Sequence, residues 1–187
     1  MSAAYFDVAF ICTGNRFRSP LAAGLLSAQV GELPVRASSL GILDLGSVGA
    51  LSEAVQVAGS FGVDLSGHQT RSMAQVDLEP FDLIVCFEWT HVHAVIIDGQ
   101  APIERTFTLP ELVGLLRGLP ESQARSASVE QAVARVQQAH ALRPPGFRSK
   151  RPPEIPDPLG RPPAAQRQIA DELRELVLEL SRLLFSY

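Results

Sequence analysis

A short apolar strand that ends at a cysteine is the feature that most constrains the fold of this chain. Residues 5–11 (YFDVAFI) form a run of strand length that stops at Cys12. A short loop follows, and Ser19 then stands immediately before Pro20, which suits an N-cap serine with proline at the first helical position. The segment therefore predicts a strand, a tight loop and a helix in succession.

The same alternation continues along the chain. We expect further strands at residues 35–40, 81–87 and 104–108, and helices at 51–61, at 90–97, after Pro110, and at 164–184. Residues 81–87 (FDLIVCF) are almost entirely apolar, as in strands of a parallel sheet that is covered on both faces. Strands alternating with helices predict an α/β fold, a doubly wound four-stranded parallel sheet with helices on both faces.

Residues 118–163 differ in character from the rest. Ser128 and Gln131 have capping-box spacing and precede one more amphipathic helix. Eight of the fourteen prolines fall between residues 144 and 163, and residues 143–153 (RPPGFRSKRPP) contain four basic residues and no acid. Because proline removes backbone donors, we expect an extended surface loop there.

Composition narrows the function class. Of the 187 residues, 46% are hydrophobic and 19% charged, which excludes wholesale disorder. The net charge of −4 argues against a nucleic-acid-binding protein. Only Cys12 and Cys86 are present, which excludes a disulfide framework and a multi-cysteine zinc site. No apolar run approaches the ~20 residues of a membrane span, and the N-terminus lacks a signal pattern, so we expect a soluble cytoplasmic protein without a membrane partner.

The loop after the first strand, Cys12 to Arg18 (CTGNRFR), carries the chemistry. Between a strand and a helix, its backbone N–H groups can point inward and form an anion nest. Arg18 can clamp two phosphate oxygens, and the positive field favours the nucleophilic thiolate of Cys12. We therefore predict a phosphate-binding cradle with a built-in nucleophile, formed by Cys12, Thr13, Gly14, Asn15, Arg16, Phe17 and Arg18.

Two other interpretations of this loop fit less well. Cys12 could be a small apolar residue at the end of a buried strand, with Arg18 merely solvated. That interpretation leaves Gly14 and the strand–loop–helix context unexplained. A nucleotide-binding P-loop would need a Gly-Lys-Ser/Thr sequence after the strand, and none is present.

The chain resembles the low-molecular-weight protein tyrosine phosphatases. The family signature is a cysteine, five residues, an arginine and then Ser-Pro, matched here from Cys12 to Pro20. The similarity continues through residues 61–71 (FGVDLSGHQTR) and 81–86, and through Asp157-Pro158 before the last helix. It leaves out residues 117–153. The resemblance thus implies one phosphatase domain over residues 1–187, with an insertion at about 117–153 that contains the basic proline-rich loop.

The resemblance also implies roles for individual residues. Cys12 would be the nucleophile, Arg18 the phosphate clamp and Asp157 the general acid, with Ser19 donating a hydrogen bond to the Cys12 sulfur. Asn15, Ser39 and His68 match a supporting polar network. No metal or other cofactor is implied, and His91 and His93 have no carboxylate or cysteine beside them at metal-ligand spacing.

The expected activity is that of a protein-tyrosine-phosphatase acting on a phosphoprotein. Arg16 and Phe17 depart from the family pattern, which commonly has an apolar residue and a second cysteine there, so substrate identity stays open. A thiol-dependent arsenate reductase is one alternative, although Cys86 is its only candidate partner thiol. A non-catalytic phosphoprotein-binding pseudophosphatase is another.

The basic loop adds one hypothesis. Arg143, Arg148, Lys150 and Arg151 precede Asp157 by few residues, so they could attract acidic phosphopeptides to the site. A solvated linker explains the same composition.

Overall fold

A computed structural model describes residues 5–120, 128–144 and 152–185. Its sheet has four parallel strands in the order β2-β1-β3-β4. The strands are β1 (Phe6–Cys12), β2 (Val35–Gly41), β3 (Leu83–Cys86) and β4 (Thr106–Thr108). Parallel strands end at the same edge of a sheet, and β1 is central. Cys12, the last residue of β1, therefore lies at the carboxyl edge, where ligands of open α/β sheets bind.

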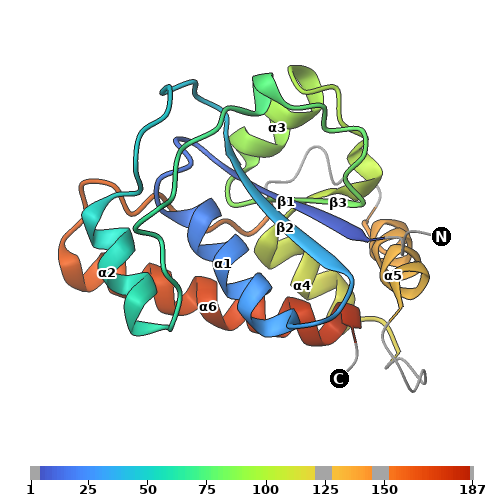
Figure 1. The fold of residues 1–187 in the computed structure, drawn as a ribbon. Helices are drawn as coiled ribbons and strands as arrows, with labels where there is room; N and C mark the ends of the chain where they lie inside the picture. Colours follow the sequence, from blue (N-terminus) through green and yellow to red (C-terminus); the bar gives the residue numbers. More distant parts are fainter. Residues whose placement is uncertain (1–4, 121–127, 145–151, 186–187) are drawn as a thin grey trace.

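Helices cover both faces of the sheet, which confirms the predicted doubly wound fold (Figure 1). One face carries α1 (Arg18–Val30), α4 (Leu109–Arg117) and α6 (Pro163–Phe185), with α2 (Ser52–Ser60) packed on α1 and α6. The other face carries α3 (Trp89–Ile97) and the short 3₁₀ helix η1 (Met73–Gln75). A second 3₁₀ turn, η2 (Ile103–Arg105), leads into β4. No helix in the described ranges combines the length and apolar character of a membrane span.

Most of residues 128–144 form one additional helix, α5 (Val129–Ala141). It packs against α4, α6 and η2. Ser128 is its N-cap, and the Ser128 hydroxyl accepts a hydrogen bond from the Gln131 N–H, at 3.3 Å. The start of this helix is thus the one that the Ser128 spacing predicts.

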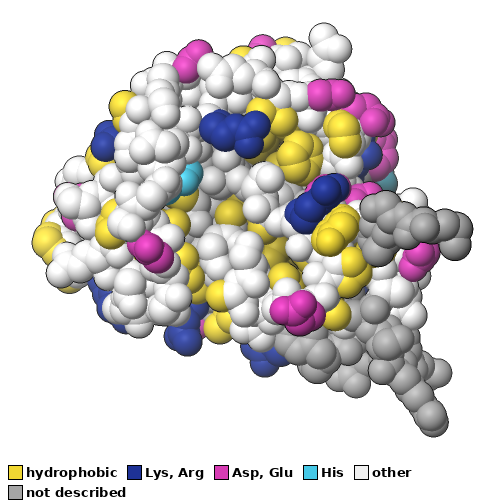
Figure 2. Space-filling view, in the orientation of Figure 1, with side chains coloured by type: hydrophobic (Ala, Val, Ile, Leu, Met, Phe, Trp, Pro, Cys, Tyr) yellow, Lys and Arg dark blue, Asp and Glu magenta, His cyan; other side chains and the backbone are white. Residues whose placement is uncertain are grey.

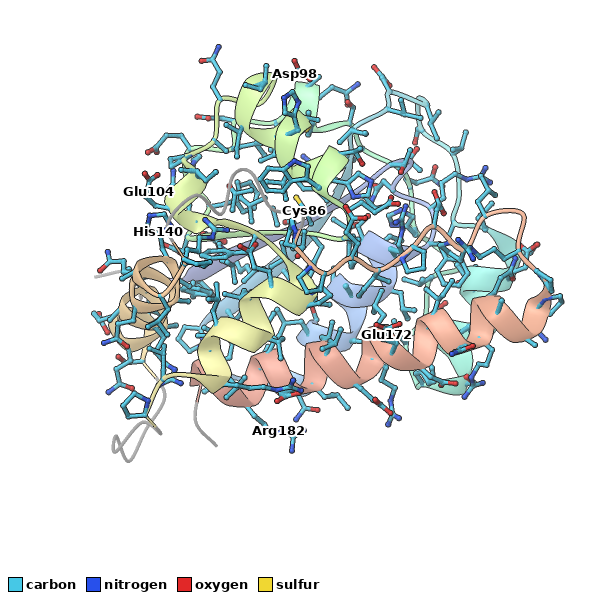
Figure 3. All side chains as sticks on the ribbon, turned by 180° about the vertical axis from the view of Figure 1, so that it is seen from behind. Cys86, Asp98, Glu104, His140, Glu172 and Arg182 are labelled. Atoms are coloured by element: carbon cyan, nitrogen blue, oxygen red, sulfur yellow. The ribbon has the colours of Figure 1, made fainter. Side chains whose placement is uncertain are left out.

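The two cysteines lie on opposite faces of the sheet. Alternation along β1 and β3 places Cys12 in the core with α1 and α6, whereas Cys86 packs in the core under α3. The strand register pairs Cys86 with Ile11. In the view from behind, Cys86 lies inside the molecule beneath α3 (Figure 3). A disulfide between these thiols would have to cross the sheet.

Ser19 is not the N-cap of α1, contrary to the sequence prediction. The helix begins at Arg18 with Phe17 as its N-cap, so Ser19 lies inside the first turn. The Ser19 hydroxyl contacts the Cys12 sulfur at 3.0 Å and donates to the Leu40 carbonyl at 3.1 Å. The loop therefore uses this hydroxyl, and it is not available to the helix end.

Arg143 cannot attract substrates, which corrects part of the basic-loop hypothesis. Its buried guanidinium pairs with Glu111 at 2.9 Å and donates to the carbonyls of Ile103 and Thr106 at 2.7 and 2.6 Å. It also lies 3.9 Å from the centroid of the Phe107 ring. This arginine joins α5 to β4 and α4. The other three basic residues, Arg148, Lys150 and Arg151, lie outside the described residues.

Candidate active site

Asn15 determines the shape of the loop between β1 and α1. Its backbone has a φ of 54°, in the left-handed region that asparagine tolerates better than most residues. Its buried amide donates to the hydroxyls of Ser19 and Ser39, each at 2.9 Å, and accepts from the Arg71 N–H at 2.9 Å. The His68 Nε2 donates to the Asn15 carbonyl at 2.7 Å. The structure thus brings together Asn15, Ser39 and His68, the three residues of the expected polar network, and adds Ser19 to them.

The end of β2 lies very close to this loop. The Cys12 carbonyl accepts from the Ile42 N–H at 2.9 Å. A Cβ added to Gly41 would lie 3.0 Å from the Asn15 nitrogen and 3.1 Å from the Gly14 carbonyl carbon. Only glycine allows such a close approach of two backbones without displacing the loop.

Cys12 lies at the base of a pocket of about 240 Å³. Only 3% of the residue is exposed, and its sulfur lies 3.0 Å from the Ser19 hydroxyl. Because the one hydrogen of that hydroxyl is donated to the Leu40 carbonyl, the Cys12 thiol is the donor in this contact, and Ser19 can donate to a thiolate only if its hydrogen turns from Leu40 to the sulfur. The pocket walls are mainly aliphatic and come from Leu43, Leu45, Leu51 and Leu159, together with Phe17. Apolar side chains also reach the surface on the side of the molecule that carries α2 and the start of α6 (Figure 2).

Arg18 is buried behind the pocket and bound on two edges. Its Nη1 donates to Glu88 Oε2 at 2.8 Å and to the Ile155 carbonyl at 3.0 Å. Its Nη2 donates to the Thr13 hydroxyl at 3.2 Å and lies 3.0 Å from Asp157 Oδ2. Its Nε makes no hydrogen bond to the described residues, so one guanidinium N–H remains for a ligand.

Asp157 reaches this site from the segment before α6. The segment is attached to the sheet by the Ile155 N–H, which donates to the Phe87 carbonyl at 2.8 Å. Asp157 Oδ1 accepts from the Leu159 N–H at 3.0 Å, a turn that orients the carboxylate. The side chain is 40% exposed and lines the same pocket as Cys12 and Arg18. The three residues predicted to be catalytic therefore meet in one place.

Sequence reasoning missed two residues of this site, Glu88 and His91. Glu88 is the N-cap of α3, and its N–H donates to His91 Nδ1 at 3.1 Å. His91 Nε2 lies 2.9 Å from the Thr13 hydroxyl. Burial, and then the charge of Arg18, lower the pKa of His91 to about 4, so the imidazole is neutral at pH 7. The signal was the Glu-x-x-His spacing directly after the predicted strand at residues 81–87.

The other histidine of α3 does not take part in this site. His93 is exposed on the outer side of α3. Within residues 5–120, 128–144 and 152–185, no group of three or more His, Cys, Asp or Glu side chains is arranged to hold a metal ion.

Comparison with known proteins places these features in a family. Residues 7–115 match the model of the family described as low molecular weight phosphotyrosine protein phosphatase. The low molecular weight protein-tyrosine-phosphatase Etp of Escherichia coli K12 is 35% identical over 89 residues. That match covers 48% of this chain and 59% of Etp, so the chain spans little more than half of this relative.

Solved structures extend the similarity to the whole fold. A low molecular weight protein tyrosine phosphatase from T. tengcongensis superposes with a TM-score of 0.68 and 26% identity, over 93% of this chain and 96% of that one. The YwlE arginine phosphatase from Geobacillus stearothermophilus superposes with a TM-score of 0.65 and 22% identity, over 95% and 91% of the two chains. At that lower identity, the second comparison supports the fold alone.

Proposed function

This chain belongs to the low molecular weight phosphotyrosine protein phosphatase family, and from that premise we propose that it hydrolyses phosphotyrosine in proteins through a cysteinyl-phosphate intermediate. One observation carries the proposal. Cys12 and Arg18, from the loop after β1, and Asp157, from the distant segment before α6, line a single pocket at the carboxyl edge of the sheet. A nucleophile, an anion clamp and an acid within one pocket are the groups that this reaction requires.

Substrate binding would begin with the phosphoryl group in the loop. The backbone N–H groups of residues 13–18 and the N-terminus of α1 favour an anion there. Arg18 offers its unpartnered Nε, and a second donor becomes available if the phosphate replaces Asp157 at Nη2. Asp157 is the partner that can leave, because its side chain is partly exposed, whereas the Nη1 edge is held by Glu88 and a buried carbonyl.

Two displacements at phosphorus would follow. The Cys12 thiolate attacks, an S–P bond forms, and the bond from phosphorus to the leaving oxygen breaks as protonated Asp157 gives its proton to that oxygen. Water then attacks the cysteinyl-phosphate and transfers a proton to the Asp157 carboxylate. The S–P bond breaks, which releases phosphate and the thiolate. Arg18 and the loop amides stabilise the charge on the equatorial oxygens in both steps.

The pocket walls favour an aromatic phosphate ester. A tyrosine ring would lie against the leucines at positions 43, 45, 51 and 159, and its burial there stabilises the complex. A phosphorylated arginine would instead lose hydration of its guanidinium group against aliphatic walls. Arg16, whose Nε donates to the Gly49 carbonyl at 3.0 Å, adds a positive charge on the same wall and further disfavours that substrate.

An arsenate reductase is less well supported. Such an enzyme needs a second thiol to receive oxidising equivalents from the first. Cys86 is fully buried on the other face of the sheet, and burial raises the pKa of its thiol far above the usual range.

We further propose that the protein is cytoplasmic and that it forms a single domain with an insertion. A reducing, cytoplasmic compartment suits an enzyme that depends on a free thiol. We also regard the chain as one phosphatase domain in which residues 117–153, including α5, are an insertion. The packing of α5 on α4 and α6 supports this arrangement.

The direct test is phosphate release by the purified protein in the presence of EDTA. We expect turnover of 4-nitrophenyl phosphate and of a phosphotyrosine peptide, with much less from a phosphoarginine peptide of the same sequence. Acid quenching during turnover should trap a phosphorylated protein that is absent in Cys12→Ser. Tight phosphate binding without turnover would overturn the enzyme proposal in favour of a pseudophosphatase, and faster turnover of the phosphoarginine peptide would overturn the substrate class.

A further inference from the structure

The Thr13 side chain has an unusual hydrogen-bonding position at the edge of the pocket. Its Oγ1 lies 3.2 Å from Arg18 Nη2 and 2.9 Å from His91 Nε2. A guanidinium can only donate hydrogen bonds, so Thr13 is the acceptor in the first contact. The role of the hydroxyl in the second contact depends on which nitrogen of His91 carries the proton.

The start of α3 fixes that proton. The Glu88 backbone N–H donates to His91 Nδ1 at 3.1 Å, so Nδ1 is an acceptor and carries no hydrogen. A neutral imidazole then has its hydrogen on Nε2. His91 is fully buried beside the cation of Arg18, which disfavours a second proton. His91 therefore donates to Thr13. Glu88 Oε2, at 3.4 Å from Nε2, is the more distant acceptor.

Both lone pairs of the Thr13 hydroxyl are consequently occupied, and only its own hydrogen remains. Within the described residues, Oγ1 has no hydrogen-bonding partner besides Arg18 and His91. Because Thr13 lines the pocket, the hydrogen is free to meet an anion there. We propose that His91 is a positioning residue that fixes the Thr13 hydroxyl as a donor to the bound phosphate. This inference rests on the proposed function.

A purely structural role for His91 makes a different prediction. In that case the imidazole matters because it caps α3 through Nδ1, and the contact with Thr13 is incidental. Two amide substitutions separate the roles, because each imitates one ring nitrogen. In His91→Asn, the amide oxygen can replace Nδ1 at the cap, but nothing reaches Thr13. In His91→Gln, the amide nitrogen can replace Nε2 as the donor, while the cap is lost.

The experiment compares phosphate affinity by titration calorimetry with kcat and KM for 4-nitrophenyl phosphate. Thr13→Val and His91→Asn should each weaken inorganic phosphate binding by roughly 10- to 100-fold, the usual effect of losing a hydrogen bond to a charged group. His91→Gln should retain most of the affinity. The double variant Thr13→Val/His91→Asn should bind no more weakly than Thr13→Val alone, because both changes remove the same donor. His93→Asn, on the exposed side of the same helix, should match the wild type.

Several results would overturn the inference. They are wild-type phosphate affinity in Thr13→Val, weaker binding in His91→Gln than in His91→Asn, or additive losses in the double variant. If the His91 variants do not fold, two measurements still test the inference: phosphate binding by Thr13→Val, and the ¹⁵N spectrum of the His91 imidazole in the wild-type protein. A hydrogen on His91 Nδ1 in the phosphate complex would contradict the inference. Because phosphate binding is measured directly, absence of wild-type turnover would count against the proposed function alone.

Discussion

Replacing Asp157 with asparagine should change two measurable quantities in opposite directions. In the free protein the Asp157 carboxylate lies 3.0 Å from Arg18 Nη2, the donor that we assign to the incoming phosphate. Asparagine retains the shape of the side chain and removes the charge. We therefore expect slower turnover, because the proton donor is lost, together with tighter binding of inorganic phosphate, because its competitor at Arg18 is lost.

The exposure of the pair determines the size of the second effect. Arg18 is buried, but the Asp157 side chain is 40% exposed, so solvent screens the interaction and ~0.2–1 kcal/mol is appropriate. Removing it should strengthen phosphate binding by only about 1.5- to 5-fold. Loss of general acid catalysis should lower kcat by roughly 10²–10⁴-fold for phenyl phosphate, whose leaving group needs a proton. The loss should be much smaller for 4-nitrophenyl phosphate.

The assay is steady-state kinetics on both esters, together with calorimetry of phosphate binding. Equal losses of kcat for the two esters would remove Asp157 from the acid role. Weaker phosphate binding in Asp157→Asn would show that the carboxylate supports the cradle and does not compete for it.

Three further predictions follow from the same structure. Cys12→Ser should abolish turnover of 4-nitrophenyl phosphate while calorimetry still detects phosphate binding, since the hydroxyl preserves the cradle but is a poor nucleophile. Arg143→Met leaves the carboxylate of Glu111 buried without its partner, so the free energy of unfolding in urea should fall by about 3–5 kcal/mol, with KM for aryl phosphates unchanged at low and high salt. Peroxide should inactivate the protein with poor recovery in dithiothreitol, because Cys86 lies across the sheet from Cys12 and cannot form a reversible disulfide with it. Bound phosphate should protect Cys12 from oxidation, and Phe17→Cys should improve recovery. A peroxide-treated protein that is two hydrogens lighter by intact mass, as a disulfide would be, and that reduction fully rescues would contradict this prediction.

The sheet and its helices could be predicted because their signals are local. The runs at residues 5–11 and 81–87 are apolar apart from Asp7 and Asp82, and in the structure both strands are covered on two faces. Element ends were less certain, since they depend on tertiary partners. Ser19 shows why: its position before a proline suggests a cap, but the nearby sulfur and the carbonyl at the end of β2 use its hydroxyl.

The candidate site likewise contains residues that local sequence signals predict and residues that they do not. The loop from Cys12 to Arg18 is contiguous, so its spacing alone indicates an anion cradle. Asp157 was reached through family resemblance, because an Asp-Pro pair by itself is common in turns. Glu88 could not be predicted as a partner of Arg18 from sequence, because the contact joins residues that are 70 positions apart. The prediction that Arg143 attracts acidic phosphopeptides was wrong because composition counts the charge of this residue but does not show that its side chain is buried.

Arg18 explains why these distant residues must meet. A buried guanidinium is costly unless its N–H groups are paired, so the fold has to supply acceptors from several elements. Glu88 and the Ile155 carbonyl supply a permanent pair on one edge, and they attach the N-terminus of α3 and the segment before α6 to the loop. On the other edge, Asp157 is partly exposed and exchangeable. A fully paired arginine would bind phosphate poorly, and an unpaired one would destabilise the fold. One fixed edge and one exchangeable edge satisfy both requirements, and in the mechanism that we propose the exchange releases Asp157 when a phosphoryl group arrives.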